Sequence, residues 1–342
     1  MPARAPSKRR VSPLRCTPVG EAAVEPRVRV GISGWSYKPW RKVFYPPGLR
    51  VKDELTFASR AFDSIELNAS FYSLQRPESY RSWRDATPED FVFAVKGGRF
   101  VTHLKRLKDA EQGLANFFAS GVLELGHKLG PILWQLPPSL AFDADRLRVF
   151  FESLPRTRAD GARLAQRHAP LLTGRAAFGD QSDAPIRHAL EVRHPSFLCP
   201  EFVTLLRAYG IAPCIADSAG LYPVIEDLCA DFVYVRLHGA ERLYTSGYDQ
   251  PELVLWAERI QRWMRGQAAA RPRHADANSY GDGRARDVYV YFDNDVKVRA
   301  PYDAQNLARI LRGDETRTAP GALASVSEEP RTIWPAWQRR RA

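Results

Sequence analysis

Eight short apolar, β-branched runs recur along this 342-residue chain, and stretches with helical spacing separate them. The predicted strands are residues 28–32, 64–72, 91–96, 131–136, 188–194, 212–217, 232–238 and 287–293. The predicted helices are residues 53–62, 77–86, 109–128, 143–154, 200–209, 223–229, 251–263 and 303–311. Strands that alternate with helices are joined by right-handed crossovers into a parallel sheet. Eight such units predict an α/β fold, a single (β/α)8 barrel of the TIM type.

An open, doubly wound sheet is the alternative architecture. Sheets of that kind that bind dinucleotides carry a glycine-rich G-x-G-x-x-G loop after the first strand. Here residues 31–36 read GISGWS, which does not match that pattern and has an aromatic residue after the second glycine. We therefore expect the closed barrel, over residues 27–312.

Four segments depart from the alternation and are rich in Arg, Ala, Gly, Pro or Ser. We expect a disordered basic tail over residues 1–26, surface insertions at 156–187 and 266–286, and a mostly disordered tail over 313–342. The first insertion has the composition of a short helix over 159–168. These segments carry +3, +3, +2 and +1 of the net charge of +11, which leaves +2 for the barrel. The pI near 9.6 therefore reflects these four segments rather than the barrel. Two interpretations of them stay open, namely that they bind a nucleic acid and that they form only a solvated basic surface.

The hydropathy and the cysteines favour a cytoplasmic protein. No apolar run approaches the roughly eighteen residues that a membrane span needs. Residues 1–26 are basic without an apolar core, so we expect no signal peptide and no membrane partner. The cysteines lie outside any CxxC spacing, which favours reduced thiols; they are Cys16, Cys199, Cys214 and Cys229.

Polar residues interrupt the apolar strands near their carboxyl ends. Counting in twos along each strand puts these residues on the inward face. They are Glu66, Asn68, Lys96, Gln135, Glu191, Arg193, Asp217, Arg236, His238, and either Asn294 or Asp293 just past the last strand. Because the carboxyl ends of parallel barrel strands surround one mouth, we expect these side chains to meet there. Polar groups are expensive to bury unless they are paired, so their coincidence needs an explanation.

One interpretation is structural, since three cations balance three carboxylates and such a set can neutralise itself as an ion-pair plug. The other is catalytic. The candidate catalytic residues are Glu66, Glu191, Asp217 and His238, and the candidate binding residues are Asn68, Lys96, Gln135, Arg193, Arg236 and Asn294. His238 is the best general acid or base by its intrinsic pKa. The three cations suit a phosphate or carboxylate on the substrate.

The carboxylates leave two further arrangements open. Glu66 and Glu191 lie on strands three apart, which disfavours a retaining glycosidase pair and leaves a wider acid–base arrangement open. Glu191, Asp217 and His238 on adjacent strands have the residue types of a hard-metal triad. The arginines on the same strands oppose a dication, so we predict no metal and no cofactor.

Aromatic residues follow three of the strands. Trp35 and Tyr37 come after the first strand, Tyr72 ends the second, and Tyr248 follows the seventh. Aromatic rings beside a polar site commonly stack on a sugar or a base, so we expect these four to contribute to binding. His103, after the third strand, is a weaker candidate.

Several stretches resemble one known family. They are residues 31–37 (GISGWSY), 44–46 (FYP), 65–72 (IELNASFY), 95–96 (VK), 102–103 (TH), 133–138 (LWQLPP), 190–194 (LEVRH) and 234–239 (YVRLHG). As a set they are similar to the YecE-like family, also called domain of unknown function 72. The resemblance spans about residues 27–312 and implies a TIM-type barrel but no established reaction. The closing motif departs from the family pattern, because Asp293 and Asp303 stand where amides are usual.

These observations favour an enzyme, hydrolase-like or isomerase-like, that uses acid–base chemistry on a small polar, anionic or sugar-containing substrate at the barrel mouth. A nucleic-acid binding or phosphodiester-processing protein is one alternative. A metal-dependent hydrolase or isomerase is another.

Overall fold

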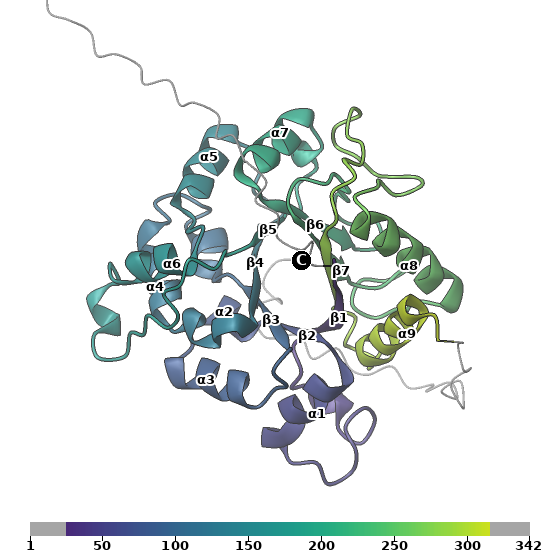
Figure 1. Cartoon of the computed structure of the whole chain (residues 1–342), viewed down its shortest axis with the longest axis horizontal. Helices are drawn as coiled ribbons and strands as arrows, with labels where there is room; N and C mark the ends of the chain where they lie inside the picture. Colours follow the sequence, from purple (N-terminus) through teal and green to yellow (C-terminus); the bar gives the residue numbers. More distant parts are fainter. Residues whose placement is uncertain (1–24, 315–342) are drawn as a thin grey trace, which may run out of the picture.

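A closed ring of eight parallel strands forms the centre of the molecule, seen in the computed structural model, which describes residues 25–314 (Figure 1). Each strand pairs with the next along the chain, and β8 pairs with β1. The strands are β1 (Val28–Ser33), β2 (Ser64–Leu67), β3 (Val92–Lys96), β4 (Leu129–Gln135), β5 (His188–Glu191), β6 (Ala212–Asp217), β7 (Phe232–Leu237) and β8 (Asp287–Phe292). The predicted (β/α)8 barrel is confirmed.

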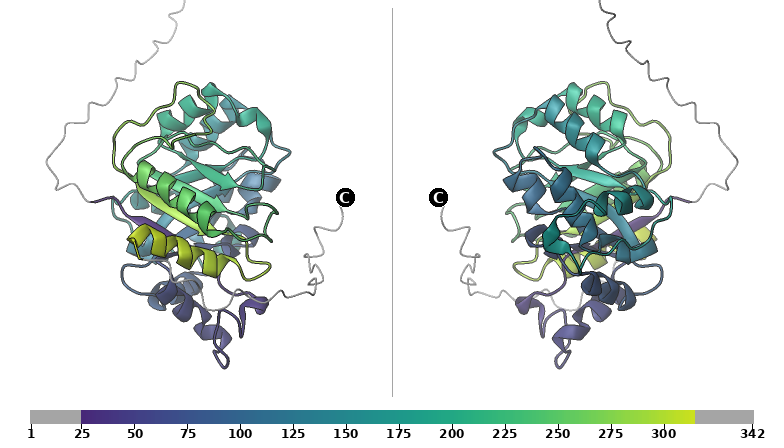
Figure 2. Two further views of the ribbon diagram at one scale, coloured as in Figure 1. Left: turned by 90° about the vertical axis from the view of Figure 1, so that its right-hand side faces the viewer. Right: turned by 90° about the vertical axis from the view of Figure 1, so that its left-hand side faces the viewer.

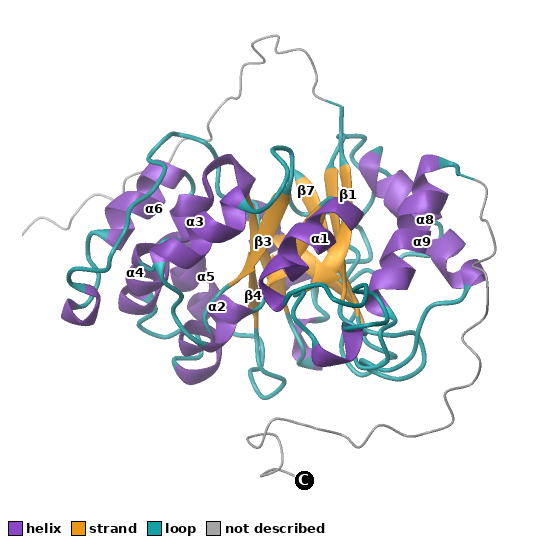
Figure 3. Cartoon of the chain, turned by 90° about the horizontal axis from the view of Figure 1, so that it is seen from below, coloured by secondary structure: helices purple, strands orange, loops and turns teal. Residues whose placement is uncertain are grey.

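Helices surround this ring on its outer side. They are α1 (Glu54–Ala61), α2 (Ala69–Tyr72), α3 (Pro77–Asp85), α4 (Glu111–Ala119), α5 (Ala144–Ser153), α6 (Arg158–Ala165), α7 (Pro200–Tyr209), α8 (Gln250–Met264) and α9 (Ala300–Arg312). Figure 2 shows α8 and α9 side by side on one flank. Figure 3 shows the strands between this pair and the group of α3, α4, α5 and α6. No helix of residues 25–314 is long and apolar enough to cross a membrane.

Three predicted elements end earlier than the residue pattern indicates. The predicted strand 64–72 stops at Leu67, because Asn68 takes a helical conformation and begins the short helix α2. The predicted strand 188–194 stops at Glu191. The predicted helix 109–128 breaks at Gly121, whose φ of 106° is left-handed, and a 3-10 segment, Val122–Lys128, follows it. An apolar pattern alone does not reveal such backbone turns.

The predicted helix 223–229 is instead an extended loop. Its two carboxylates are buried and bind backbone N–H groups of the segment 266–286: Glu226 accepts from Arg273, and Asp227 accepts from Ala275. A buried carboxylate requires such donors, and meeting them competes with helix formation. The segment 266–286 therefore lies against this loop.

The insertion 156–187 contains α6, close to the expected short helix. Thr157 and Asp160 form a capping box at its start, and α6 packs against α4. The two expected tails lie almost wholly outside the described residues. Cys199, Cys214 and Cys229 are free thiols, as predicted, and Cys16 lies outside the described part.

Two apolar layers hold the barrel together. The larger lies between strands and helices, and the smaller fills the barrel interior with alanines, Cys214 and the rings of Tyr234, Tyr289 and Tyr291. At the amino-terminal end Arg187 pairs with Asp231 and Asp287, at 2.9 and 2.6 Å. The interior is thus filled below the mouth, so the polar strand ends meet only at the carboxyl-terminal end.

Candidate functional site

Arg236, on β7, is the centre of a buried charge cluster at the carboxyl-terminal mouth. Its Nη1 lies 2.8 Å from Oε2 of Glu191, and its Nη2 lies 2.9 Å from Oε1 of Glu66 and 2.8 Å from Oδ2 of Asp293. The Arg236 side chain is only 1% exposed. Burial alone would lower its pKa, but the three carboxylates raise it well above the ordinary value. One guanidinium thus joins carboxylates from β2, from β5 and from the end of β8.

Glu191 is held by a second arginine as well. Nη2 and Nε of Arg193 lie 2.6 and 2.7 Å from Oε1 of Glu191, and the guanidinium lies over the ring of Tyr222 at 4.5 Å. Burial would raise the pKa of Glu191, yet Arg193 and Arg236 hold it well below its ordinary range. A carboxylate held so firmly in its ionised form is a poor general acid or base, and its role here is to orient the two arginines.

Glu66 is saturated by neutral donors that the sequence pattern did not single out. Ser33 donates its hydroxyl to Oε1 of Glu66, and Tyr234 donates its hydroxyl to Oε2 at 2.6 Å. Nδ2 of Asn68 in turn donates to the Ser33 hydroxyl at 2.9 Å. Ser33 and Tyr234 could have been found by spacing: Ser33 ends the first strand, and Tyr234 lies two positions before Arg236 on the same face.

His238 is oriented by Asp293. Its Nδ1 lies 3.0 Å from Oδ2 of Asp293, within ion-pair distance, and neither Nδ1 nor Nε2 has a partner with hydrogen-bond geometry among the described residues. The ring of Tyr244 meets the imidazole edge-on at 5.3 Å. Burial and then Arg236 lower the pKa of His238, which keeps the ring neutral. With the Nδ1 proton toward Asp293, the lone pair of Nε2 is left available, as in other Asp–His pairs.

Lys96 lies on the inner face of β3 and is 8% exposed. Its Nζ has no ion pair and no hydrogen bond within residues 25–314, and it lies 4.6 Å from the centre of the Phe71 ring. Burial and then the Arg236 charge lower its pKa to about 8. Gln135, on the neighbouring strand β4, is also buried, and its amide makes no hydrogen bond in the same part of the chain.

Two predicted residues lie away from this cluster. Asp217 has the opposite parity to Cys214 and Ala216, which line the barrel interior, and it accepts from the Tyr248 hydroxyl at 3.0 Å. Tyr248 is packed in the outer core, so its ring is not free to stack on a ligand. The inward placement predicted for Asp217 is therefore corrected.

Asp293, rather than Asn294, is the residue that reaches the cluster from the last strand. The inward residues of β8 are Tyr289 and Tyr291, and Asp293 continues that series. Asn294 points outward, where its Nδ2 donates to the backbone oxygen of Ser246 at 3.0 Å and to Oδ2 of Asp303 at 2.8 Å. Asn294 thus ties the loop that contains Ser246 to helix α9 behind the mouth.

The remaining aromatic candidates divide into two kinds. Tyr72 is 53% exposed, and burial of its hydroxyl and then Asp293 raise its pKa, which places it at the edge of the cluster. Tyr37 donates its hydroxyl to the backbone oxygen of Ser33 at 2.5 Å. Trp35 packs edge-on against Trp83 at 5.7 Å, a contact of the outer core. Tyr72 is therefore the ring best placed to meet a ligand.

Two further titratable groups border the mouth. Burial and then Asp293 raise the pKa of Asp295 to about 7. Burial and then Lys96 lower the pKa of His103 to about 4, and its ring meets Phe71 edge-on at 5.1 Å. The weaker candidate His103 thus lies within the electrostatic reach of the cluster.

The hard-metal triad is not assembled. Glu191 is occupied by two arginines, and Asp217 by Tyr248. In the described residues no group of three His, Cys, Asp or Glu side chains converges to hold a metal ion. The ligand set on which the metal-dependent alternative depended is therefore missing from this mouth.

Residues 29–327 match the model of the family described as "Protein of unknown function DUF72". This chain belongs to the DUF72 family. The UPF0759 protein YunF of Bacillus subtilis strain 168 is 23% identical over 325 residues, which cover 86% of this chain and 99% of YunF. The UPF0759 protein YecE of Escherichia coli K12 is 27% identical over 196 residues, 56% of this chain and 59% of YecE.

Solved structures of the same family share the fold. A DUF72 protein from Thermotoga maritima MSB8 has a TM-score of 0.63 and 26% identity, and the match covers 84% of this chain and 99% of that one. A DUF72 protein from Enterococcus faecalis V583 has a TM-score of 0.60 at 15% identity, over 83% of this chain and 95% of that one, which shows the fold alone. The family assignment expected from the sequence is confirmed, and it indicates no specific activity.

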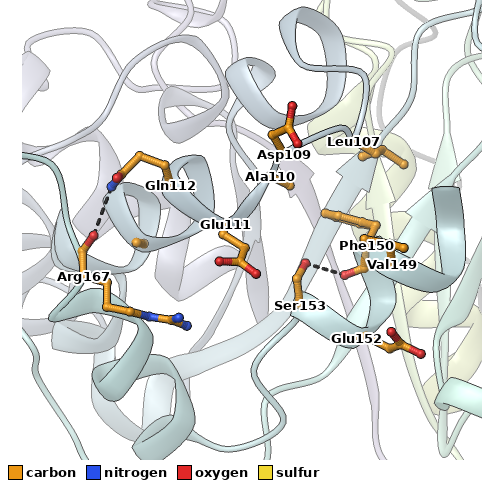
Figure 4. Close-up of a pocket in the computed structure, with 11 residues that line it drawn as sticks. Leu107, Asp109, Ala110, Glu111, Gln112, Val149, Phe150, Glu152, Ser153 and Arg167 are labelled. Atoms are coloured by element: carbon orange, nitrogen blue, oxygen red, sulfur yellow. Dashed lines mark hydrogen bonds between the residues drawn. The ribbon is translucent and has the colours of Figure 1, made fainter. Parts of the chain in front are cut away.

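A cleft of about 650 Å³ opens on the side of this DUF72 barrel, between α4 and α5 (Figure 4). Gln112 crosses one end to the backbone oxygen of Arg167 at 3.0 Å, and Ser153 bonds to that of Phe150 at 2.6 Å. No predicted site residue lines this cleft. This cleft therefore does not coincide with the residues expected to carry chemistry. We place the candidate site at the barrel mouth, because the groups with shifted pKa values and without hydrogen-bond partners gather there.

Proposed function

We propose that this DUF72 protein is an enzyme that performs general acid–base chemistry on a small anionic or sugar-type molecule at the barrel mouth. The observation that carries the proposal is that Nζ of Lys96 and Nε2 of His238, both in the charge cluster, have no hydrogen-bond or ion-pair partner among the described residues. A plug built for stability alone would leave neither group unpaired, since buried polar atoms without partners cost free energy.

His238 is the proton-transfer group in this proposal. Its neutral ring and its contact with Asp293 leave Nε2 able to take a proton from a bound molecule and to return it. Lys96 supplies a positive charge for an anionic substituent or a developing oxyanion. Glu66 and Glu191 are assigned to the positioning of Arg236 rather than to proton transfer, because the guanidinium occupies both.

Charge balance favours a small ligand over a polyanion at this mouth. The cations Lys96, Arg193 and Arg236 face the anions Glu66, Glu191 and Asp293, so the formal charges of the cluster cancel. A nucleic acid needs a sustained excess of positive charge along its backbone, and that excess lies in the tails and insertions.

A thermal-shift screen followed by turnover assays tests the proposal. The compounds are sugar phosphates, small carboxylic acids and free sugars, and the proteins are the wild type, His238→Asn, Lys96→Met and the exposed control His127→Asn. We expect at least one compound to raise the Tm of the wild type and of His127→Asn, and to be converted by both. We expect Lys96→Met to weaken binding, and His238→Asn to bind without conversion.

The acid–base proposal fails on either of two results. One is that no compound of these classes raises the Tm of the wild type. The other is that His238→Asn converts the compound as fast as the wild type does. Circular dichroism of each variant establishes that it is folded, so a loss of conversion is assigned to the site.

A further inference from the structure

We infer that Lys96 is a nucleophile that forms an imine with the aldehyde or ketone carbonyl of a small substrate. The inference rests on the proposed enzyme function and names the substrate class of the same site. Amines of buried lysines carry out this chemistry when the surroundings keep a fraction of them unprotonated at neutral pH.

The backbone around Lys96 is held in place, which fixes the point from which its side chain extends into the mouth. The backbone oxygen of Lys96 accepts from the Ser70 hydroxyl at 2.7 Å. The next residue, Gly97, is packed against Trp134 so closely that a Cβ would lie 2.2 Å from Cε3 of the ring. A nucleophile supported from both sides in this way loses little freedom when it meets a substrate.

Every carboxylate near Lys96 is already occupied by an arginine. Glu66, Glu191 and Asp293 influence the Lys96 charge from β2, β5 and the end of β8, but each lies within 2.9 Å of a guanidinium nitrogen. Arginine stays protonated, whereas a lysine can give up its proton. The carboxylates of the cluster therefore form their ion pairs with Arg193 and Arg236, and Lys96 is the cation that can lose its charge.

The other neighbours of Lys96 act on its charge in opposite directions, and Arg236 favours the free amine. Arg236 on β7 is a like charge, and a second cation beside a lysine is one of the known means of activating it. The Phe71 ring at 4.6 Å favours the ammonium, but it supplies neither a negative charge nor a hydrogen-bond acceptor atom. The low pKa of Lys96, about 8, agrees with these contacts. His103 adds no charge to this environment, because burial and then Lys96 lower its own pKa to about 4.

Lys128 shows what a structural buried lysine looks like in the same fold. It is 3% exposed, and its Nζ donates to the backbone oxygens of Arg84 and Thr87 at 2.7 and 2.8 Å. Burial lowers the pKa of Lys128 too, but these two bonds give its ammonium partners. Lys96 is buried to a similar extent but has no such acceptors among the described residues, so its burial at the mouth favours the neutral amine.

The reaction balances with groups that the mouth holds. The Nζ lone pair attacks the carbonyl carbon, an N–C bond forms, and the carbonyl π electrons move to oxygen, which takes up a proton. The nitrogen loses a proton, the hydroxyl group of the carbinolamine takes up a second proton, and its C–O bond breaks as the oxygen leaves as water; the net uptake of one proton comes from solvent. We assign the proton transfers to His238, whose Nε2 has no hydrogen-bond partner among the described residues and whose Nδ1 lies 3.0 Å from Asp293 in the same cluster. The resulting iminium keeps one positive charge beside the carboxylates.

Reductive trapping tests the inference. The wild-type protein is incubated at pH 7 with glycolaldehyde or with pyruvate in the presence of sodium cyanoborohydride, which reduces an imine to a stable secondary amine. Intact-mass spectrometry then detects the mass of the probe less one oxygen, and peptide mapping locates the modified lysine. Lys96→Met and Lys96→Arg are the test variants, and Lys105→Met, which removes an exposed lysine after β3, is the control.

We expect Lys96 to be modified at least about ten-fold faster than Lys105, because each unit by which a pKa is lowered raises the free-amine fraction about ten-fold at neutral pH. The adduct should vanish in both Lys96 variants and persist in Lys105→Met. The inference is overturned if Lys96 is modified no faster than Lys105, or if the Lys96 variants carry the same adduct. That result leaves the acid–base proposal standing, since His238→Asn and the ligand screen decide that one separately.

Discussion

Arg236 and Glu191 form an ion pair in which Nη1 and Oε2 are 2.8 Å apart and the side chains are 1% and 0% exposed. Both charges have left water, so each depends on the other and on the surrounding hydrogen bonds. Because Arg236 also holds Glu66 and Asp293, this pair connects β2, β5, β7 and the end of β8 where the site lies. The stability of the barrel and the geometry of the mouth are thus coupled through one guanidinium.

Glu191→Gln should destabilise the protein by about 3–5 kcal/mol at pH 7, because it leaves Arg236 and Arg193 with less compensating charge in a buried place. The folded-state pKa of Glu191 is depressed, so its contribution is present at neutral pH and is lost as the pH falls below about 4.3. Urea unfolding of Glu191→Gln and of the exposed control Glu241→Gln measures this. A loss below 1 kcal/mol would contradict the ion-pair account.

Lys96→Met should leave the protein as stable as the wild type at pH 7, or more stable by on the order of 1–3 kcal/mol. The folded-state pKa of Lys96 lies below its ordinary value of 10.5, at about 8, so the unfolded chain binds more protons between those values. The lysine therefore costs stability below pH 8, and the cost disappears as the pH approaches 10.5. Unfolding curves at pH 7 and pH 10 measure the difference.

Lys128→Met is the matched comparison and should destabilise by about 1–3 kcal/mol. The substitution leaves the backbone oxygens of Arg84 and Thr87 without their buried donor. Equal effects of the two Lys→Met substitutions would mean that Lys96 has a partner after all.

Gly97→Ala should destabilise by about 1–3 kcal/mol through overpacking, since the new methyl group would lie 2.2 Å from the Trp134 ring. Gly98→Ala is the control, because the nearest atom to a Cβ there is the backbone oxygen of Ser70 at 3.7 Å. Guanidinium unfolding compares the two neighbours. If Gly97→Ala is as mild as Gly98→Ala, the Trp134 ring can move, and the position of Lys96 is less rigid than we infer.

Asp303→Asn should stabilise the protein at pH 8 by on the order of 1–3 kcal/mol. Burial raises the pKa of Asp303 to about 6, from an ordinary value of 3.8. The folded state therefore loses stability as the pH rises from about 4 to 6 and stays weakened above that. Asparagine avoids the ionisation, and its amide oxygen can still accept from Asn294.

Unfolding at pH 5 and pH 8 checks this, with the exposed control Asp183→Asn expected to change little at either pH. The gain from Asp303→Asn should be larger at pH 8. A loss of stability at pH 8 would show instead that Arg299 needs the Asp303 charge, since Arg299 is the cation that influences it.

Much of the candidate site could be predicted from strand periodicity. Lys96, Glu191 and Arg236 each interrupt an apolar run, and the alternation of a strand carries each of them to the inner face. The same counting gives the wrong face for Asp217. A shift of one residue moves a side chain to the other face of a strand, and the sequence alone does not show which residues of this strand point inward. At the end of β8, where Asp293 and Asn294 are adjacent, the same counting does not decide which of the two faces the mouth.

Other parts of the site depend on contacts between distant residues. The neutral donors Ser33 and Tyr234 look like ordinary strand residues until the barrel closes and places both hydroxyls on Glu66. The pairing of His238 with Asp293 joins β7 to the end of β8. No local pattern reports which carboxylate an arginine will take, because that choice depends on distances across the closed barrel.

The sequence by itself determined the (β/α)8 barrel, the family and the set of polar residues at the mouth, because hydrophobic alternation and strand–helix order are local properties. Only the tertiary structure decided which of those residues are paired. Two arginines take up Glu66, Glu191 and Asp293, and this leaves the amine of Lys96 and Nε2 of His238 with neither a hydrogen bond nor an ion pair in the described barrel. Which charges pair depends on the distances between side chains and on their burial, and both exist only in the folded barrel.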